Sequence, residues 1–176
     1  MLDHQLLVAH MVQHLLLMTV AAPLILLGFP RNAPPLHPVL CWLASTAIVI
    51  GWHVPALFEL GMRWHRTEQA SFLVAGLLFW SPIIEREPRW SVPLYLFLAT
   101  LPCDALSAFL TFCGRVVYPH YLHADSPLRD QELAGALMWV WVTFAYLVPA
   151  VAVTIKLLGP GGAGPCPAKS DHPLNW

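Results

Sequence analysis

The stretch LVAHMVQHLLLMTVAAPLILLG, Leu7–Gly28, decides how this chain folds. It is almost wholly apolar and is long enough to cross a bilayer, which takes about 20 helical residues. Its first half nevertheless carries His10, Gln13 and His14. Residues four apart share one face of a helix, so His10 and His14 stack, and Met18 continues their line by one turn. Polar side chains at that depth are costly and are tolerated where they face a protein interior, a cavity or a metal. The stretch therefore predicts a membrane helix with a functional polar face.

The composition is that of an integral membrane protein. Of the 176 residues 57% are hydrophobic and 11% are charged, and the mean hydropathy is +0.61. A soluble domain carries roughly 25% charged residues. The net charge of −1 and the lack of any basic run give no indication of nucleic-acid binding. The opening residues MLDHQLL lack a positive segment, so we expect no cleavable signal peptide.

Five apolar stretches are long enough to span a bilayer, which predicts an all-α bundle of about five spanning helices. We expect a single transmembrane domain over residues 1–158 and a disordered Gly- and Pro-rich tail over residues 159–176. The helices are expected at about Leu6–Leu27, Val39–Leu60, Thr67–Ile84, Val92–Phe112 and Arg129–Leu158. With five crossings, four of the nine Lys and Arg residues lie on the N-terminal face and five on the other. This small excess of positive residues only weakly favours a cytoplasmic location for the C-terminal tail.

Polar residues converge at the end of the bundle that carries the N-terminus. At 1.5 Å per residue, His10 and His14 lie roughly 6 and 12 Å inside the first helix. His53 lies about 10 Å inside the second helix from the same face, and Asp104 roughly 12 Å inside the fourth. Glu68 begins the third helix at this level, and seven of the nine histidines belong to the same layer. We therefore expect these side chains to share a site.

Each candidate also has a purely structural interpretation. Histidines of membrane helices often hydrogen-bond neighbouring helices, which could explain His10 and His14. Glu68 and Asp130 could serve only as acids at helix N-termini, where the helix dipole favours them. Asp104 is harder to explain in this way, because a buried carboxylate in lipid needs a histidine, an arginine, a metal or a proton as its partner.

The ligand types leave the identity of a bound metal open. Imidazoles spaced by four residues occur in zinc and copper sites, and nearby Met18 and Cys103 would favour copper. Cys103 is also explained as a small apolar filler. Zinc suits histidine and aspartate equally well on ligand type. Haem held between His53 and His10 or His14 is a third alternative.

Seven sequence blocks occur in an order that points to one family. They are HMVQHLLLMTVAAPLILLG, WHVPALFE, HRTEQASFLVAGLLFWSP, YLFLATLP, LTF, YPHY and SPLRDQELAGALMWV, from about Ala9 to Val140. Together they closely resemble the CtaG-like bacterial membrane proteins, polytopic assembly factors for caa-type cytochrome c oxidase. The resemblance implies a helical inner-membrane protein with an extracytoplasmic polar face. It further implies support for the maturation of a haem–copper terminal oxidase through copper.

The resemblance also implies which residues matter, and it shows two departures. The family's third-helix motif usually reads His-x-x-Glu-His, whereas this chain has Gln69 at the last position. Relatives commonly carry further helices before the first motif, so the alternatives here are a natural short form, a truncated start, or a subunit whose further helices come from a partner or a second copy. The positions that match the family's motifs are His10, His14, His53, His65, Glu68, Asp130 and Gln131.

Three functions follow as hypotheses. The favoured one is a non-enzymatic assembly factor that binds copper and passes it to a terminal oxidase subunit. A haem-carrying redox protein and a structural accessory subunit of the oxidase are the alternatives. The segment HRTEQ does not match the HExxH motif of metalloproteases, and no nucleophile–base pair is evident. The expected metal ligands are His10, His14, His53, His65, Glu68 and Asp104.

Overall fold

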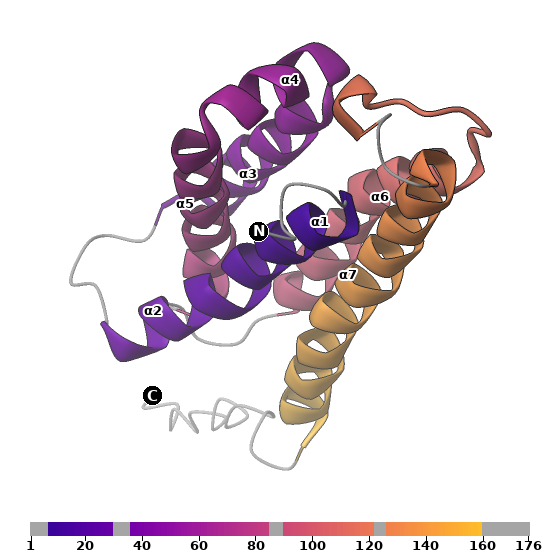
Figure 1. Ribbon diagram of the computed structural model, residues 1–176. Helices are drawn as coiled ribbons and strands as arrows, with labels where there is room; N and C mark the ends of the chain where they lie inside the picture. Colours follow the sequence, from indigo (N-terminus) through magenta and orange to yellow (C-terminus); the bar gives the residue numbers. More distant parts are fainter. Residues whose placement is uncertain (1–6, 30–35, 85–89, 122–125, 160–176) are drawn as a thin grey trace, which may run out of the picture.

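The computed structural model describes residues 7–29, 36–84, 90–121 and 126–159, and all regular elements within them are helical (Figure 1). This confirms the all-α prediction. The predicted tail from residue 160 onward lies outside the described residues. The elements are α1 (Leu7–Leu16), η1 (Leu17–Ala21), α2 (Ala22–Gly28), α3 (Pro38–His53), α4 (Pro55–Arg63), α5 (His65–Ile84), α6 (Ser91–Phe112), η2 (Pro119–Tyr121) and α7 (Pro127–Leu158).

Four stretches in the described residues are long and apolar enough to cross a membrane. They are Leu7–Gly28, His65–Ile84, Ser91–Phe112 and Pro127–Leu158. A fifth crossing is made if α3 and α4 count as one span, although α4 bends away from α3 by 85°. The fold is therefore that of a multi-pass membrane protein.

The second helix, expected from about Val39 to Leu60, is broken into two helices, α3 and α4. The helix ends at His53, and Val54 is extended, with φ −68° and ψ 126°. The ring of Pro55 disfavours helical backbone at the residue before it, so the chain turns there and starts a new helix. As a result, α4 crosses the end of the bundle instead of continuing through it (Figure 1).

The first span is interrupted by the π-helix η1, at the point where α5 approaches it most closely. The N–H of Ala22 donates to the carbonyl of Leu17, five residues earlier. The indole N–H of Trp80 donates to the carbonyl of Met18 at 2.9 Å. A Cβ on Gly76 would lie 2.7 Å from the Cβ of Ala22 and 2.9 Å from the Cα of Met18. Glycine at this position thus allows the two backbones to touch.

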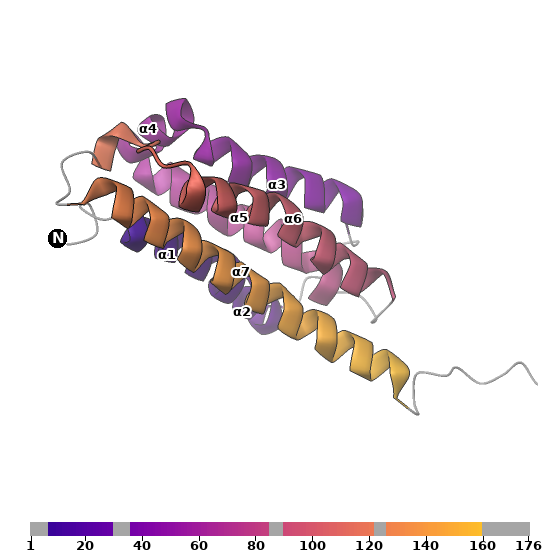
Figure 2. The ribbon, with the colours of Figure 1, turned by 90° about the vertical axis from the view of Figure 1, so that its right-hand side faces the viewer.

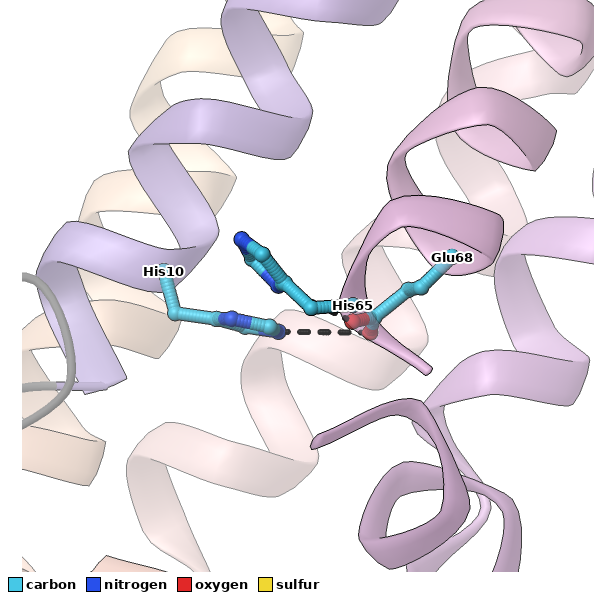
Figure 3. A group of neighbouring side chains, drawn as sticks. All are labelled: His10, His65 and Glu68. Atoms are coloured by element: carbon cyan, nitrogen blue, oxygen red, sulfur yellow. Dashed lines mark ion pairs between the residues drawn. The ribbon is translucent and has the colours of Figure 1, made fainter. Parts of the chain in front are cut away.

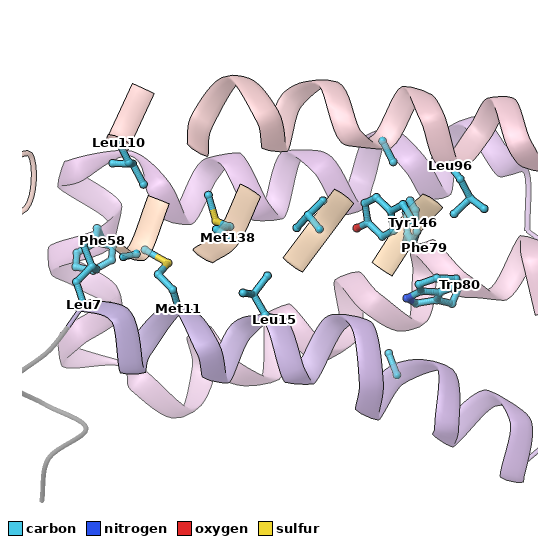
Figure 4. Close-up of a cluster of buried hydrophobic side chains, with 14 of the residues drawn as sticks. Leu7, Met11, Leu15, Phe58, Phe79, Trp80, Leu96, Leu110, Met138 and Tyr146 are labelled. Atoms are coloured by element: carbon cyan, nitrogen blue, oxygen red, sulfur yellow. The ribbon is translucent and has the colours of Figure 1, made fainter. Parts of the chain in front are cut away.

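A continuous apolar core runs between the first span and the helices packed on it, and α6 lies along α7 (Figures 2 and 4). Outward-facing apolar residues such as Val140, Phe144 and Ile155 are exposed, as expected for a surface in contact with lipid. The core residues labelled in Figure 4 are Leu7, Met11, Leu15, Phe58, Phe79, Trp80, Leu96, Leu110, Met138 and Tyr146.

Two polar side chains of α7 fasten the end of the bundle at which α1 begins. The carboxylate of Asp130 accepts the backbone N–H of Leu7 at 2.6 Å, so it caps α1 although it belongs to α7. Gln131 is 1% exposed, accepts the N–H of Val117 at 2.7 Å and donates to the carbonyl of Arg115 at 3.0 Å. These bonds hold α7, α1 and the segment after α6 in one register (Figure 2).

Candidate metal centre

The carboxylate of Glu68 lies at the centre of the polar cluster. It projects from the first turn of α5 and is 1% exposed. His10 Nε2 lies 3.3 Å from Glu68 Oε1, and His14 Nε2 lies 3.7 Å from the same oxygen. His65 Nδ1 lies 3.8 Å from Glu68 Oε2. Three imidazoles from two spanning helices thus surround one buried carboxylate, and Figure 3 shows two of them with it.

Local helix geometry brings these side chains together. His10 and His14 are one turn apart on α1, and their ring centroids are 4.3 Å apart. His65 and Glu68 are three apart on α5, which begins after the non-helical backbone of Trp64. The expected convergence of polar side chains at the N-terminal end of the bundle is therefore found for these four histidine and glutamate residues.

The donor atoms fit a transition-metal ion. One ligand atom each from His10, His65 and Glu68 lies within 4.8 Å of the other two. Ligands of a tetrahedral site with bonds of about 2.0 Å are separated by about 3.3 Å, close to the distances found here. His10 Nε2 and both Glu68 oxygens are buried without a hydrogen-bond partner among the described residues. Such groups are costly unless a proton or a cation compensates them, so this donor set suits zinc or copper.

Gln69 contacts the His65 ring at the nitrogen that does not face Glu68. Its side-chain nitrogen donates to Gln13 Oε1 at 2.7 Å and lies 2.8 Å from His65 Nε2. This contact holds the far side of the His65 ring and leaves Nδ1 facing Glu68. If His65 binds a metal through Nδ1, its Nε2 must carry the proton, and the Gln69 amide accepts it when the Gln69 and Gln13 amides are both reversed. In this chain Gln69 therefore orients a candidate ligand.

His53 is buried close to the cluster, and both it and His14 contact the ring of Phe72. His14 stacks on Phe72 with centroids 3.8 Å apart, and His53 meets the same ring edge-on at 6.2 Å. His53 Nδ1 lies 2.7 Å from the carbonyl of Val49. The group of donors around Glu68 therefore does not include His53.

Asp104 does not join the cluster either. It is half-buried on α6, which packs along α7, and its side chain interacts with Thr100 of its own helix. Cys103 lies beside it and likewise has no place among the donors around Glu68. In the described residues, then, the arrangement gives no support to Asp104 as a ligand of the same ion.

The residues that cover the cluster were not predicted from the sequence. Phe58 of α4 lies 5.2 Å from the His10 ring and stacks on Tyr118 at 4.1 Å. The Tyr118 hydroxyl donates to the carbonyl of His53 at 3.1 Å. Burial raises the pKa of the Tyr118 phenol, which keeps this donor protonated. Gly61 also belongs here, because a Cβ on it would lie 2.9 Å from Glu68 Cδ. The segment YPHY, which contains Tyr118, indicated part of this cover in the sequence. The positions of Phe58 and Gly61 could not be predicted, because they depend on the bend before α4.

One family model matches this chain. Its description is cytochrome c oxidase caa3 assembly factor, and it matches residues 35–159. The matched segment contains His53, His65 and Glu68, whereas His10 and His14 precede it. No curated protein and no solved structure matches the chain.

Proposed function

Because the chain belongs to the cytochrome c oxidase caa3 assembly factor family, we propose that it binds copper and passes it to a terminal oxidase subunit. In this proposal His10, His14, His65 and Glu68 hold the ion, and copper is a cargo of the protein. The observation that carries the proposal is the buried Glu68 carboxylate, which faces three imidazoles and has no hydrogen-bond partner in the described residues.

Ligand chemistry supports copper as the cargo. Imidazole nitrogens bind copper well, and histidine is a common ligand of copper sites. The resemblance to assembly factors of haem–copper oxidases supplies a reason to carry this metal. No step in such a role requires catalysis, so the protein acts as a carrier and not as an enzyme.

We further propose that the protein lies in the bacterial inner membrane with its metal centre at the extracytoplasmic end. The faint excess of Lys and Arg on the opposite face supports this orientation. The oxidase subunit would then receive copper at the membrane surface, where Phe58 of α4 and Tyr118 cover the cluster.

The test is copper titration of the full chain purified in detergent, followed by elemental analysis. We expect about one copper per chain at the Glu68 centre, lost or weakened at least tenfold in Glu68→Gln, since removal of one charged ligand leaves only neutral imidazoles. His65→Gln, at a position one third exposed, should weaken binding without a folding defect. Glu132→Gln, a half-buried glutamate on α7, is the matched control and should bind like the unchanged protein.

The proposal fails if the purified protein neither contains copper nor takes it up, or if Glu132→Gln loses as much binding as Glu68→Gln. An absorption spectrum of the same sample separates the haem alternative, because bound haem gives Soret and α bands. Stable stoichiometric co-purification with the oxidase, together with full tolerance of glutamine at His10 and His14, would favour the accessory subunit.

A further inference from the structure

A small internal cavity lies next to the Glu68 cluster, and its lining is rich in sulfur. Its volume is about 40 Å³, which exceeds the 10–15 Å³ that one water needs. His14 and His53 line it, from α1 and α3. The sulfur-containing residues that line it are Met11, Met18, Cys103 and Met138.

The two histidines bring unpaired nitrogens to this cavity. His53 Nδ1 faces the carbonyl of Val49 at 2.7 Å, so in the neutral ring Nδ1 carries the proton and Nε2 keeps its lone pair. His53 Nε2 and both nitrogens of His14 are buried without a hydrogen-bond partner in the described residues. The two residues are 7% and 4% exposed. Buried acceptors left in this state are costly, and an ion in the cavity would satisfy His53 Nε2 and one nitrogen of His14.

We propose that this cavity is a second, inner metal site, which takes copper(I). His53 and His14 supply imidazole nitrogens, and Met11 and Met18 supply thioether sulfur. Thioether sulfur is a soft ligand that suits copper(I). The ligands are neutral, so a monovalent ion leaves one uncompensated charge in the apolar interior and a divalent ion would leave two.

His14 connects the two sites. Its Nε2 lies 3.7 Å from Glu68 Oε1, while the same side chain lines the inner cavity. His10, His14 and Met18 follow one another along one face of the first span, from the Glu68 cluster to the cavity. Copper(I) bound at the Glu68 cluster therefore reaches the cavity by exchanging ligands along this face, without change of oxidation state. The inference rests on the proposed function for the source of the ion.

The test uses silver(I), a soft monovalent probe without redox chemistry, and zinc(II) on the full chain in detergent. Met11→Leu/Met18→Leu keeps the volume of the core. We expect it to lower silver(I) affinity at least tenfold and to leave zinc(II) binding unchanged. His53→Gln should likewise lose silver(I). Met62→Leu is the matched control, because Met62 lies on α4 and does not line the cavity.

The possible results separate the two proposals. If Met11→Leu/Met18→Leu and His53→Gln bind silver(I) like the unchanged chain, the inner site is refuted, whatever happens at Glu68. The same holds if Met62→Leu loses as much silver(I). If silver(I) binding depends on these residues while neither zinc(II) nor copper binding depends on Glu68, the inner site stands and the proposed function of the Glu68 centre fails.

Discussion

The geometry of the Glu68 centre depends on Gly61, a residue without a side chain. Gly61 lies against the carboxylate, where a Cβ would come within 2.9 Å of Cδ, 3.0 Å of Oε1 and 3.2 Å of Oε2. Glu68 cannot retreat freely, because imidazoles face it on its other sides. The absence of a side chain at residue 61 is therefore part of the site.

Gly61→Ala should weaken copper binding by about tenfold or more while the protein still folds. The added methyl group pushes the carboxylate toward the histidines, and changes to groups that orient metal ligands typically cost 10–100-fold in affinity. Gly51→Ala is the matched control, since nothing lies within 4 Å of a Cβ at that helical position. Copper titration of both variants measures the effect. Equal affinities in the two variants would contradict this role for Gly61.

Among the helices, α5 and the π-helix η1 are in close contact, and backbone atoms take part in it. Gly76 meets backbone atoms of Met18 there, and the Trp80 indole occupies the Met18 carbonyl. A π-turn in a spanning helix frees such a carbonyl for a partner. This junction sets the separation of the helices that carry His14 and Glu68.

Gly76→Ala should destabilise the protein by about 1–3 kcal/mol, the usual cost of overpacking a filled core. The new methyl group would meet Ala22 Cβ at 2.7 Å and Met18 Cα at 2.9 Å, and a backbone cannot move aside as a flexible side chain does. Gly28→Ala, at the end of the first span and with nothing within 4 Å of its Cβ, is the control. Thermal unfolding in detergent compares the two. An unchanged midpoint in Gly76→Ala would show that the helices separate easily at this point.

For the whole molecule, the testable property is its orientation in the membrane. Single cysteines at His120, in η2, and at Phe29, after α2, mark opposite ends of the bundle, and both positions are exposed. The four native cysteines are replaced first. We expect a membrane-impermeant maleimide to label His120→Cys in intact spheroplasts and Phe29→Cys only after permeabilisation. The reverse pattern would place the Glu68 centre on the cytoplasmic side and refute the proposed orientation.

Sequence reasoning succeeded where a helix alone decides geometry. The spacing of His10 and His14 fixes their common face without knowledge of the fold, and the apolar lengths fix the spans. It could not settle whether Asp104 shares this site, because depth along a helix gives the height of a residue but neither the direction in which it points nor its neighbouring helices. The bend at Val54 was available from the following proline. The role of Gly61 could not be predicted from the sequence, because Gly61 meets Glu68 only once this bend has placed α4 against it.

The bond from Asp130 to the start of α1 joins residues that are far apart in the sequence, so it can form only late in synthesis. Asp130 lies 123 positions after Leu7, so the ribosome must make all the intervening helices before this cap can form. Until then α1 lacks the anchor that fixes its first turn, and His10 lies within that same stretch of helix. A nascent chain that has not yet reached α7 lacks this cap, so we expect the geometry around Glu68 to be complete only after α7 has been made.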